Sequence, residues 1–152
     1  MRILAGRDED VCTLVASIIW GPGVRFQDRK ARGFGYLDGD GILRAGFVLY
    51  DFDPANLTMQ VAAASTHRNM QTLRHLRVIP ETAFAIEPRL RVLIARTAES
   101  NAVVRRVMGA FGAVETAIPG LRLRGDGTPE AEIVCTLDRA TFEELVAKRA
   151  SL

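Results

Sequence analysis

The sequence has few cysteines and no long hydrophobic run. Its two cysteines, Cys12 and Cys135, each lie in an apolar stretch. Two thiols are too few for a disulfide framework or a four-cysteine zinc site, so we expect both to be small buried side chains. No apolar run approaches the ~20 residues that a membrane-spanning helix needs, and the N-terminal segment soon turns acidic. We therefore expect a soluble cytoplasmic protein without a membrane partner.

Net charge is also small. Lys and Arg total 20 against 18 for Asp and Glu, and aromatic residues make up 7% of the chain. A net charge of +2 is too low for a protein that coats nucleic acid, so a nucleic-acid partner is not expected. All the cations except Lys30 and Lys148 are arginine. This excess has two explanations, a phosphate-binding surface that uses the Arg fork or a bias from GC-rich codons.

The pattern of apolar residues predicts an α+β protein with one central mixed sheet and helices on both faces. No repeat or linker divides residues 1–152, so we expect a single domain. Helices are expected after Asp8 as far as 19, over 69–86 and 99–111, and from Asp138 onward. The expected strands are 2–4, 34–37, 42–52, 57–64, 90–96, 121–124 and 132–137. The carboxyl ends of the central strands, after 64 and after 97, should border a ligand crevice.

Three segments carry a family resemblance. Residues 44–51 form an apolar strand with Gly46 in its middle, 59–65 form an apolar strand that leads into a helix, and 90–101 end in Asn101. Gly112 follows that asparagine eleven residues later. In order and spacing these segments resemble the GNAT superfamily of acyl-CoA-dependent N-acyltransferases, over roughly residues 33–137.

The resemblance implies a GNAT-like fold and an activity. The chain would transfer an acetyl or other acyl group from acetyl-CoA to an amine acceptor, either a small molecule or a protein. A catalytically inactive GNAT-fold protein that serves binding or assembly is the alternative, because fold does not fix function. Strands near the C-terminus would allow two copies to pair as a homodimer.

The resemblance also implies cofactor-binding residues. The pyrophosphate would lie on the loop that opens the helix at 65–70, where backbone N–H groups and the helix dipole favour an anion. This loop has no glycine, so Arg68 is expected to supply a phosphate contact. Backbone N–H groups at the end of the preceding strand would hold the thioester oxygen. The full expected set is Ala62, Ala63, Ala64, Ser65, Thr66, Arg68, Asn69, Met70, Asn101 and Arg105.

The catalytic groups are less well marked. Many members of the family protonate the leaving thiolate with a tyrosine seven residues after the helix-opening asparagine, and this chain has Met108 there. General acid help is commonly worth ~10²–10⁴-fold, so a modest activity is expected unless the proton comes from elsewhere. The first candidate base is Asp51, at a strand end, and Glu99 and His67 come after it. The charged form of His67 is disfavoured by its neighbour Arg68. Aspartate and histidine are also common on solvated surfaces. The histidines lack partners at ligand spacing, so no metal is expected.

Overall fold

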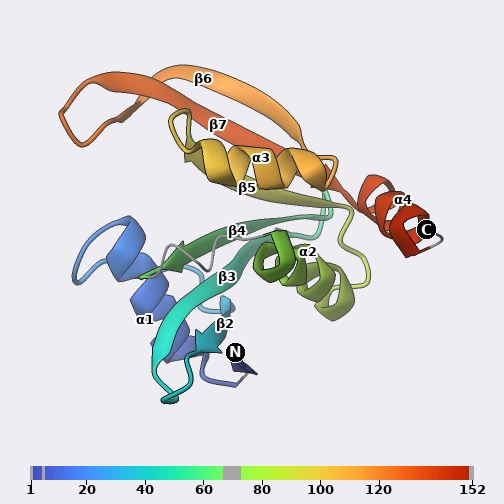
Figure 1. The fold of residues 1–152 in the computed structure, drawn as a ribbon, viewed down its shortest axis with the longest axis horizontal. Helices are drawn as coiled ribbons and strands as arrows, with labels where there is room; N and C mark the ends of the chain where they lie inside the picture. Colours follow the sequence, from blue (N-terminus) through green and yellow to red (C-terminus); the bar gives the residue numbers. More distant parts are fainter. Residues whose placement is uncertain (1, 5, 67–72, 151–152) are drawn as a thin grey trace.

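A computed structural model describes residues 2–4, 6–66 and 73–150. Within these residues the chain forms one mixed sheet with helices on both faces, which confirms the predicted fold class (Figure 1). The strands are β1 (Arg2–Leu4), β2 (Arg32–Leu37), β3 (Leu43–Asp53), β4 (Thr58–Ser65), β5 (Val92–Ala98), β6 (Val114–Leu123) and β7 (Pro129–Asp138). The helices are α1 (Asp8–Ile19), α2 (Leu73–Ile86), α3 (Ala102–Ala110) and α4 (Arg139–Ala150).

The strand order is β1-β2-β3-β4-β5-β7-β6. All neighbours pair antiparallel except β4 and β5, which run parallel because α2 connects them. The helix α1 covers β2, β3 and β4 on one face, where Val11 and Val15 pack against Val48. On the other face the larger core joins Phe47 and Leu93 to α2, α3 and α4. The sheet therefore has its parallel pair at its centre.

The start of α1 differs from its prediction. The helix was expected to begin after Asp8, which would leave Asp8 as its N-cap, but Arg7 holds the cap position and Asp8 is the first helical residue. The Oδ1 atom of Asp8 instead accepts a hydrogen bond of 2.9 Å from the backbone N–H of Gly33. The carboxylate therefore connects the helix to β2. The acidic residues of the first turn also interact favourably with the positive end of the helix dipole.

The predicted strand at 121–124 was too short, because β6 begins at Val114. Pro119 and Gly120 interrupt the apolar pattern, and the pairing with β7 shifts between Ile118 and Arg122. An edge strand tolerates proline and a bulge because one side of its backbone has no strand partner. Exposed apolar side chains lie along this edge. Pairing of two copies through it stays a prediction.

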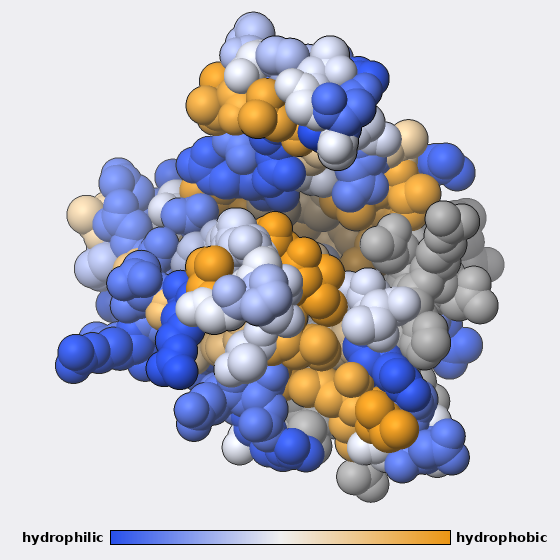
Figure 2. Space-filling model, turned by 90° about the vertical axis from the view of Figure 1, so that its left-hand side faces the viewer, coloured by the Kyte–Doolittle hydropathy of each residue, from blue (hydrophilic) through white to orange (hydrophobic). Residues whose placement is uncertain are grey.

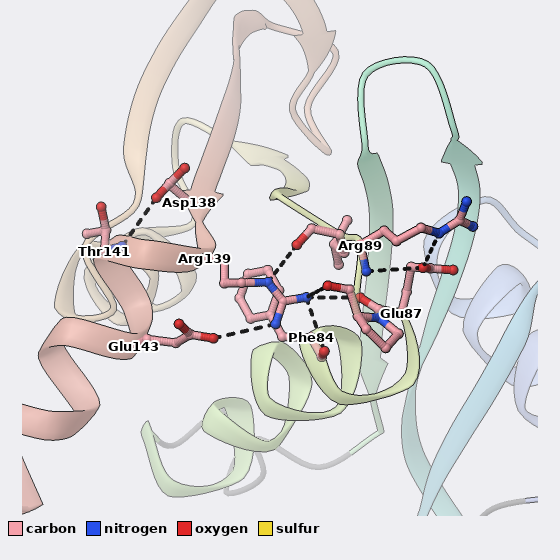
Figure 3. A network of polar contacts seen from close by, with 9 residues as sticks. Phe84, Glu87, Arg89, Asp138, Arg139, Thr141 and Glu143 are labelled. Atoms are coloured by element: carbon pink, nitrogen blue, oxygen red, sulfur yellow. Dashed lines mark hydrogen bonds and ion pairs between the residues drawn. The ribbon is translucent and has the colours of Figure 1, made fainter.

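The C-terminus of α2 is held by the side chain of Arg139 from α4 (Figure 3). The guanidinium lies over the ring of Phe84, with Cζ 4.7 Å from the ring centroid. Its Nη2 donates to the carbonyl oxygens of Phe84, Glu87 and Pro88, and its Nε donates to that of Leu90 at 2.7 Å. These are carbonyls at the end of the helix and in the turn after it, where helical N–H partners run out, so one side chain supplies donors to several of them.

Replacing Arg139 should therefore destabilise the protein. We expect Arg139→Met to lower the free energy of unfolding by about 2–4 kcal/mol, because several partly buried carbonyl groups lose a hydrogen-bond donor together. The measurement is chemical denaturation. Arg139→Lys is the matched control, since it keeps the charge but loses the planar fork, and it should recover only part of the loss. Full recovery by lysine would show that charge, and not the fork geometry, holds this end of α2.

Candidate functional site

The parallel strands β4 and β5 separate at the centre of the sheet. Their pairing runs from Thr58 with Val92 to Val61 with Ala95 and ends there. Past this point β4 continues to Ser65, paired with β3 on its other edge, and β5 continues to Ala98, paired with β7. The two strands diverge toward the left of Figure 1. They form an open wedge, and within the described residues its two inner edges have no strand partner.

A cavity of about 230 Å³ occupies this wedge and reaches both faces of the sheet. Figure 2 faces the side on which the wedge opens and shows a recess with hydrophobic residues at its rim. One arm lies between α2 and α3 and has apolar walls. The other arm lies on the face of α1. The first arm is lined by Leu76, Ile79, Pro80, Val104, Met108 and Phe111, and the second by Ile19, Trp20, Tyr50, Arg96, Arg122 and Glu132.

Several predicted cofactor residues lie at this cavity. Ala62, Ala63 and Asn101 line it, and Ala63, Ala64 and Ser65 line a smaller adjoining hollow of about 50 Å³. Asn101 also caps α3, because its Oδ1 accepts a hydrogen bond from the N–H of Val104 at 3.3 Å. Small alanine side chains keep the wedge open where the strands part.

Other predicted residues lie elsewhere. Thr66 follows the wedge edge, and both its N–H and its hydroxyl donate to the carbonyl of Arg44 on β3, each at 2.9 Å. Arg105 is held by Glu115 of β6, with Nη2 and Oε2 2.9 Å apart, so its guanidinium is already in an ion pair outside the cavity. The predicted residues His67, Arg68, Asn69 and Met70 fall outside the described residues.

The candidate base Asp51 does not line the wedge cavity. It lies at a bulge in β3 with a positive φ of 52°, and its N–H donates to Asp28. Its side chain is exposed beside a separate surface hollow that Arg89 also lines. Nothing in this geometry brings its carboxylate to the parted strands, and its catalytic role stays a prediction.

The polar residues of the second arm were not predicted from the sequence. Glu132 accepts from Arg96 Nη1 at 3.1 Å and from Arg122 Nε at 3.3 Å, and its side chain is only 11% exposed. Three different strands, β5, β6 and β7, contribute these charges. One available signal was Arg96, a cation inside an otherwise apolar strand, because alternation places its side chain on the opposite face from Ala95.

An aromatic wall bounds the same arm. The rings of Trp20 and Phe26 meet edge to face with centroids 5.0 Å apart, and Phe26 meets Tyr50 at the same distance. Burial raises the pKa of the Tyr50 hydroxyl above its usual range, and the nearby carboxylate of Asp51 raises it further. Tyr50 therefore stays protonated at neutral pH, and it is the tyrosine that lines the cavity in the described part of the chain.

Comparison with known proteins supports the fold. The sequence matches no protein-family model and no curated protein. Among solved structures, a mutant spermidine/spermine N-acetyltransferase from Vibrio cholerae superposes with a TM-score of 0.74 at 10% identity, over 94% of this chain and 97% of its own. An N-acetyltransferase from Staphylococcus aureus Mu50 gives 0.67 at 14% identity, over 90% and 97%.

The chain therefore has the GNAT fold, as its sequence resemblance implied. Identities this low establish the fold, and function has to be argued from the site. Among the helices that the structure describes, none is long and apolar enough to cross a membrane.

Proposed function

We propose that this chain is an N-acyltransferase that moves an acetyl group from acetyl-CoA to an amine acceptor. One observation carries the proposal: a cavity passes through the sheet where β4 and β5 part, so two molecules entering from opposite faces would meet at the wedge. A transferase needs this arrangement, since its two substrates must be held with their reacting atoms adjacent.

The two arms suit different substrates. The apolar arm between α2 and α3 fits the pantetheine chain of acetyl-CoA, whose amide groups would pair with the open backbone edge at 62–64. Backbone N–H groups on this edge are also the donors that would hold the thioester oxygen as negative charge develops on it. The amine acceptor would enter by the arm on the α1 face, past Trp20 and Tyr50.

The reaction balances with groups at hand. The neutral amine attacks the thioester carbonyl carbon, a C–N bond forms and the C–S bond breaks. The amine nitrogen loses one proton to water, and the departing thiolate gains one. Met108 lines the cavity but cannot donate, so Tyr50 or water supplies this proton. A Tyr50→Phe variant with unchanged kcat would assign the proton to water.

The open wedge favours an enzyme over the inactive alternative. A protein that kept the fold only for binding or assembly would need at most one arm of the cavity open. Here the residues at the parting point are Ala62, Ala63 and Ala95, and their side chains leave the cavity accessible from both faces. If the inactive alternative holds, no amine bound in the arm on the α1 face is acetylated, and turnover measurements test this directly.

Thermal unfolding with acetyl-CoA is the first test. A ligand at 100 times its Kd should add about 2.7 kcal/mol to the free energy of unfolding. For a chain of this size the midpoint should then rise by roughly 5–10 °C. ATP, which lacks the thioester arm, is the control and should give no comparable shift. The absence of a shift at millimolar acetyl-CoA and CoA would overturn the proposal. A shift without thiol release for any amine would favour the inactive alternative.

A further inference from the structure

The arm on the α1 face carries an excess of positive charge. Among its lining residues, Arg96 and Arg122 are cations and Glu132 is the carboxylate. One carboxylate neutralises one of the two guanidiniums. Glu130, the next carboxylate along β7, is turned to other partners, Arg124 and Ser100, and does not line the cavity. Among the residues that line the arm, guanidiniums therefore outnumber carboxylates by one, and Asp51, whose carboxylate also acts on Tyr50, does not line it.

The ion triad leaves donors available to a ligand. In the described part of the chain Arg96 gives Nη1 and Arg122 gives Nε to the carboxylate of Glu132. A guanidinium has five N–H donors in a planar fork, so each retains several. Their side chains are 46% and 36% exposed, whereas that of Glu132 is 11% exposed. The largely buried carboxylate of Glu132 thus holds the two more exposed guanidinium groups at one cavity.

The opposite wall of the arm is apolar. Ile19 and Trp20 end α1, with Trp20 46% exposed, and Tyr50 faces them from β3 through Phe26. Exposed aromatic surface beside a cavity provides a contact area for an apolar group at little entropic cost. A ligand that fits this arm combines an anionic group for the forks with an apolar group for the wall.

We propose that the amine acceptor is amino-acid-like: a small molecule that carries a carboxylate and an apolar or aromatic side chain near its amine. The inference rests on the proposed transferase function and deepens it. Arg96 directly follows Ala95, the last β5 residue paired with β4, so its backbone lies at the mouth of the wedge. A carboxylate bound there brings an amine a few bonds away close to the parted strands.

The same charges disfavour polyamines as acceptors in this arm. The spermidine/spermine N-acetyltransferase that shares this fold is named for polycations. A polycation entering this arm would meet two guanidiniums and one carboxylate already held by both. Like charges repel, and this repulsion is stronger in a partly desolvated cavity than in water. The two proteins share a fold, and the inference predicts an acceptor of another charge class for this chain.

The test compares ligands that differ only in the carboxylate. L-Phenylalanine and phenethylamine are titrated calorimetrically into the protein saturated with CoA, with L-leucine, L-tryptophan and spermidine alongside. L-Phenylalanine should bind at least tenfold more tightly than phenethylamine and spermidine, because a charge-assisted contact is lost in the amines. Equal affinity for L-phenylalanine and phenethylamine, or preference for spermidine, would overturn the inference.

Variants tie this preference to the two forks. Arg122→Gln and Arg96→Gln should each weaken amino-acid binding about tenfold without weakening the binding of phenethylamine or CoA. Arg124→Gln is the matched control, because Arg124 pairs with Glu130 and does not line the cavity. An equal loss of CoA affinity would assign the forks to the phosphates of CoA and overturn the inference. Failure of CoA itself to bind would instead remove the transferase proposal on which it rests.

Discussion

Ala63→Phe is expected to abolish acetyl-CoA binding in a protein that remains folded. Ala63 lies on β4 past the point where pairing with β5 ends, and it lines both the wedge cavity and the adjoining hollow. Its side chain is exposed, so a phenyl ring can be accommodated without displacing the core. The ring would occupy the space proposed for the pantetheine arm and cover the open backbone edge of the strand.

The expected loss of acetyl-CoA affinity is about 100-fold or more, equal to about 2.7 kcal/mol, which is within the range for filling a formed cavity. Calorimetric titration measures it, and thermal unfolding without ligand checks the fold. Ala55→Phe makes the same chemical change at an exposed turn residue before β4, at the other end of the strand from the wedge. The control should bind as the parent does. Full affinity in Ala63→Phe would mean that the cofactor does not use the wedge.

Local patterns predicted most of the fold because each element carries its own signal. The strands β3 and β4 alternate or run apolar, Asn101 and Gly112 bracket α3, and Asp138 accepts from the N–H of Thr141 at the start of α4. The full length of β6 was not predicted, because this strand is held by pairing with β7 and has no apolar alternation of its own. Its interior proline is acceptable only at a sheet edge, a position that sequence alone does not reveal.

Only part of the site, the strand edge of β4 and the start of α3, was predicted from the sequence. Ala62, Ala63 and Asn101 were found because two contiguous segments carry them and the family resemblance pointed there. The second arm was missed because its charges come from three strands far apart in sequence, and only the register of β5, β7 and β6 brings them together. Glu132 gives no sign in the sequence that two arginines share it.

The excess of arginine over lysine now has a more specific meaning. The sequence directed attention to Arg105, which the structure pairs with Glu115. The cations at the cavity are instead Arg96 and Arg122, braced by Glu132. Two forks on one carboxylate need planar, multiply donating groups, a geometry that two lysines would not reproduce. At these positions the choice of arginine therefore follows from geometry, whatever set the composition of the whole chain.

Gly46→Val should lower the free energy of unfolding by about 3 kcal/mol, because α1 lies too close to β3 for any side chain at that position. A Cβ atom on Gly46 would lie 2.6 Å from Cγ1 of Val11 and 3.0 Å from the carbonyl oxygen of Phe34. Gly33 on β2 is equally confined, since its Cβ would lie 2.7 Å from that of Val11. Gly33 and Gly46 thus leave the space that the fully buried side chain of Val11 occupies.

The control for Gly46 is Gly39→Val, at a turn glycine with open space around it and no positive φ, which should change stability little. Chemical denaturation measures both. A double-mutant cycle then identifies the clash: in Gly46→Val combined with Val11→Ala, the loss should fall short of the sum of the single losses by about 1 kcal/mol or more. Strict additivity would mean that the helix is not what the new side chain meets. Since α1 ends at Ile19, with Trp20 as its C-cap, and both residues line the wedge cavity, Gly46 sets how closely this wall of the cavity approaches the sheet.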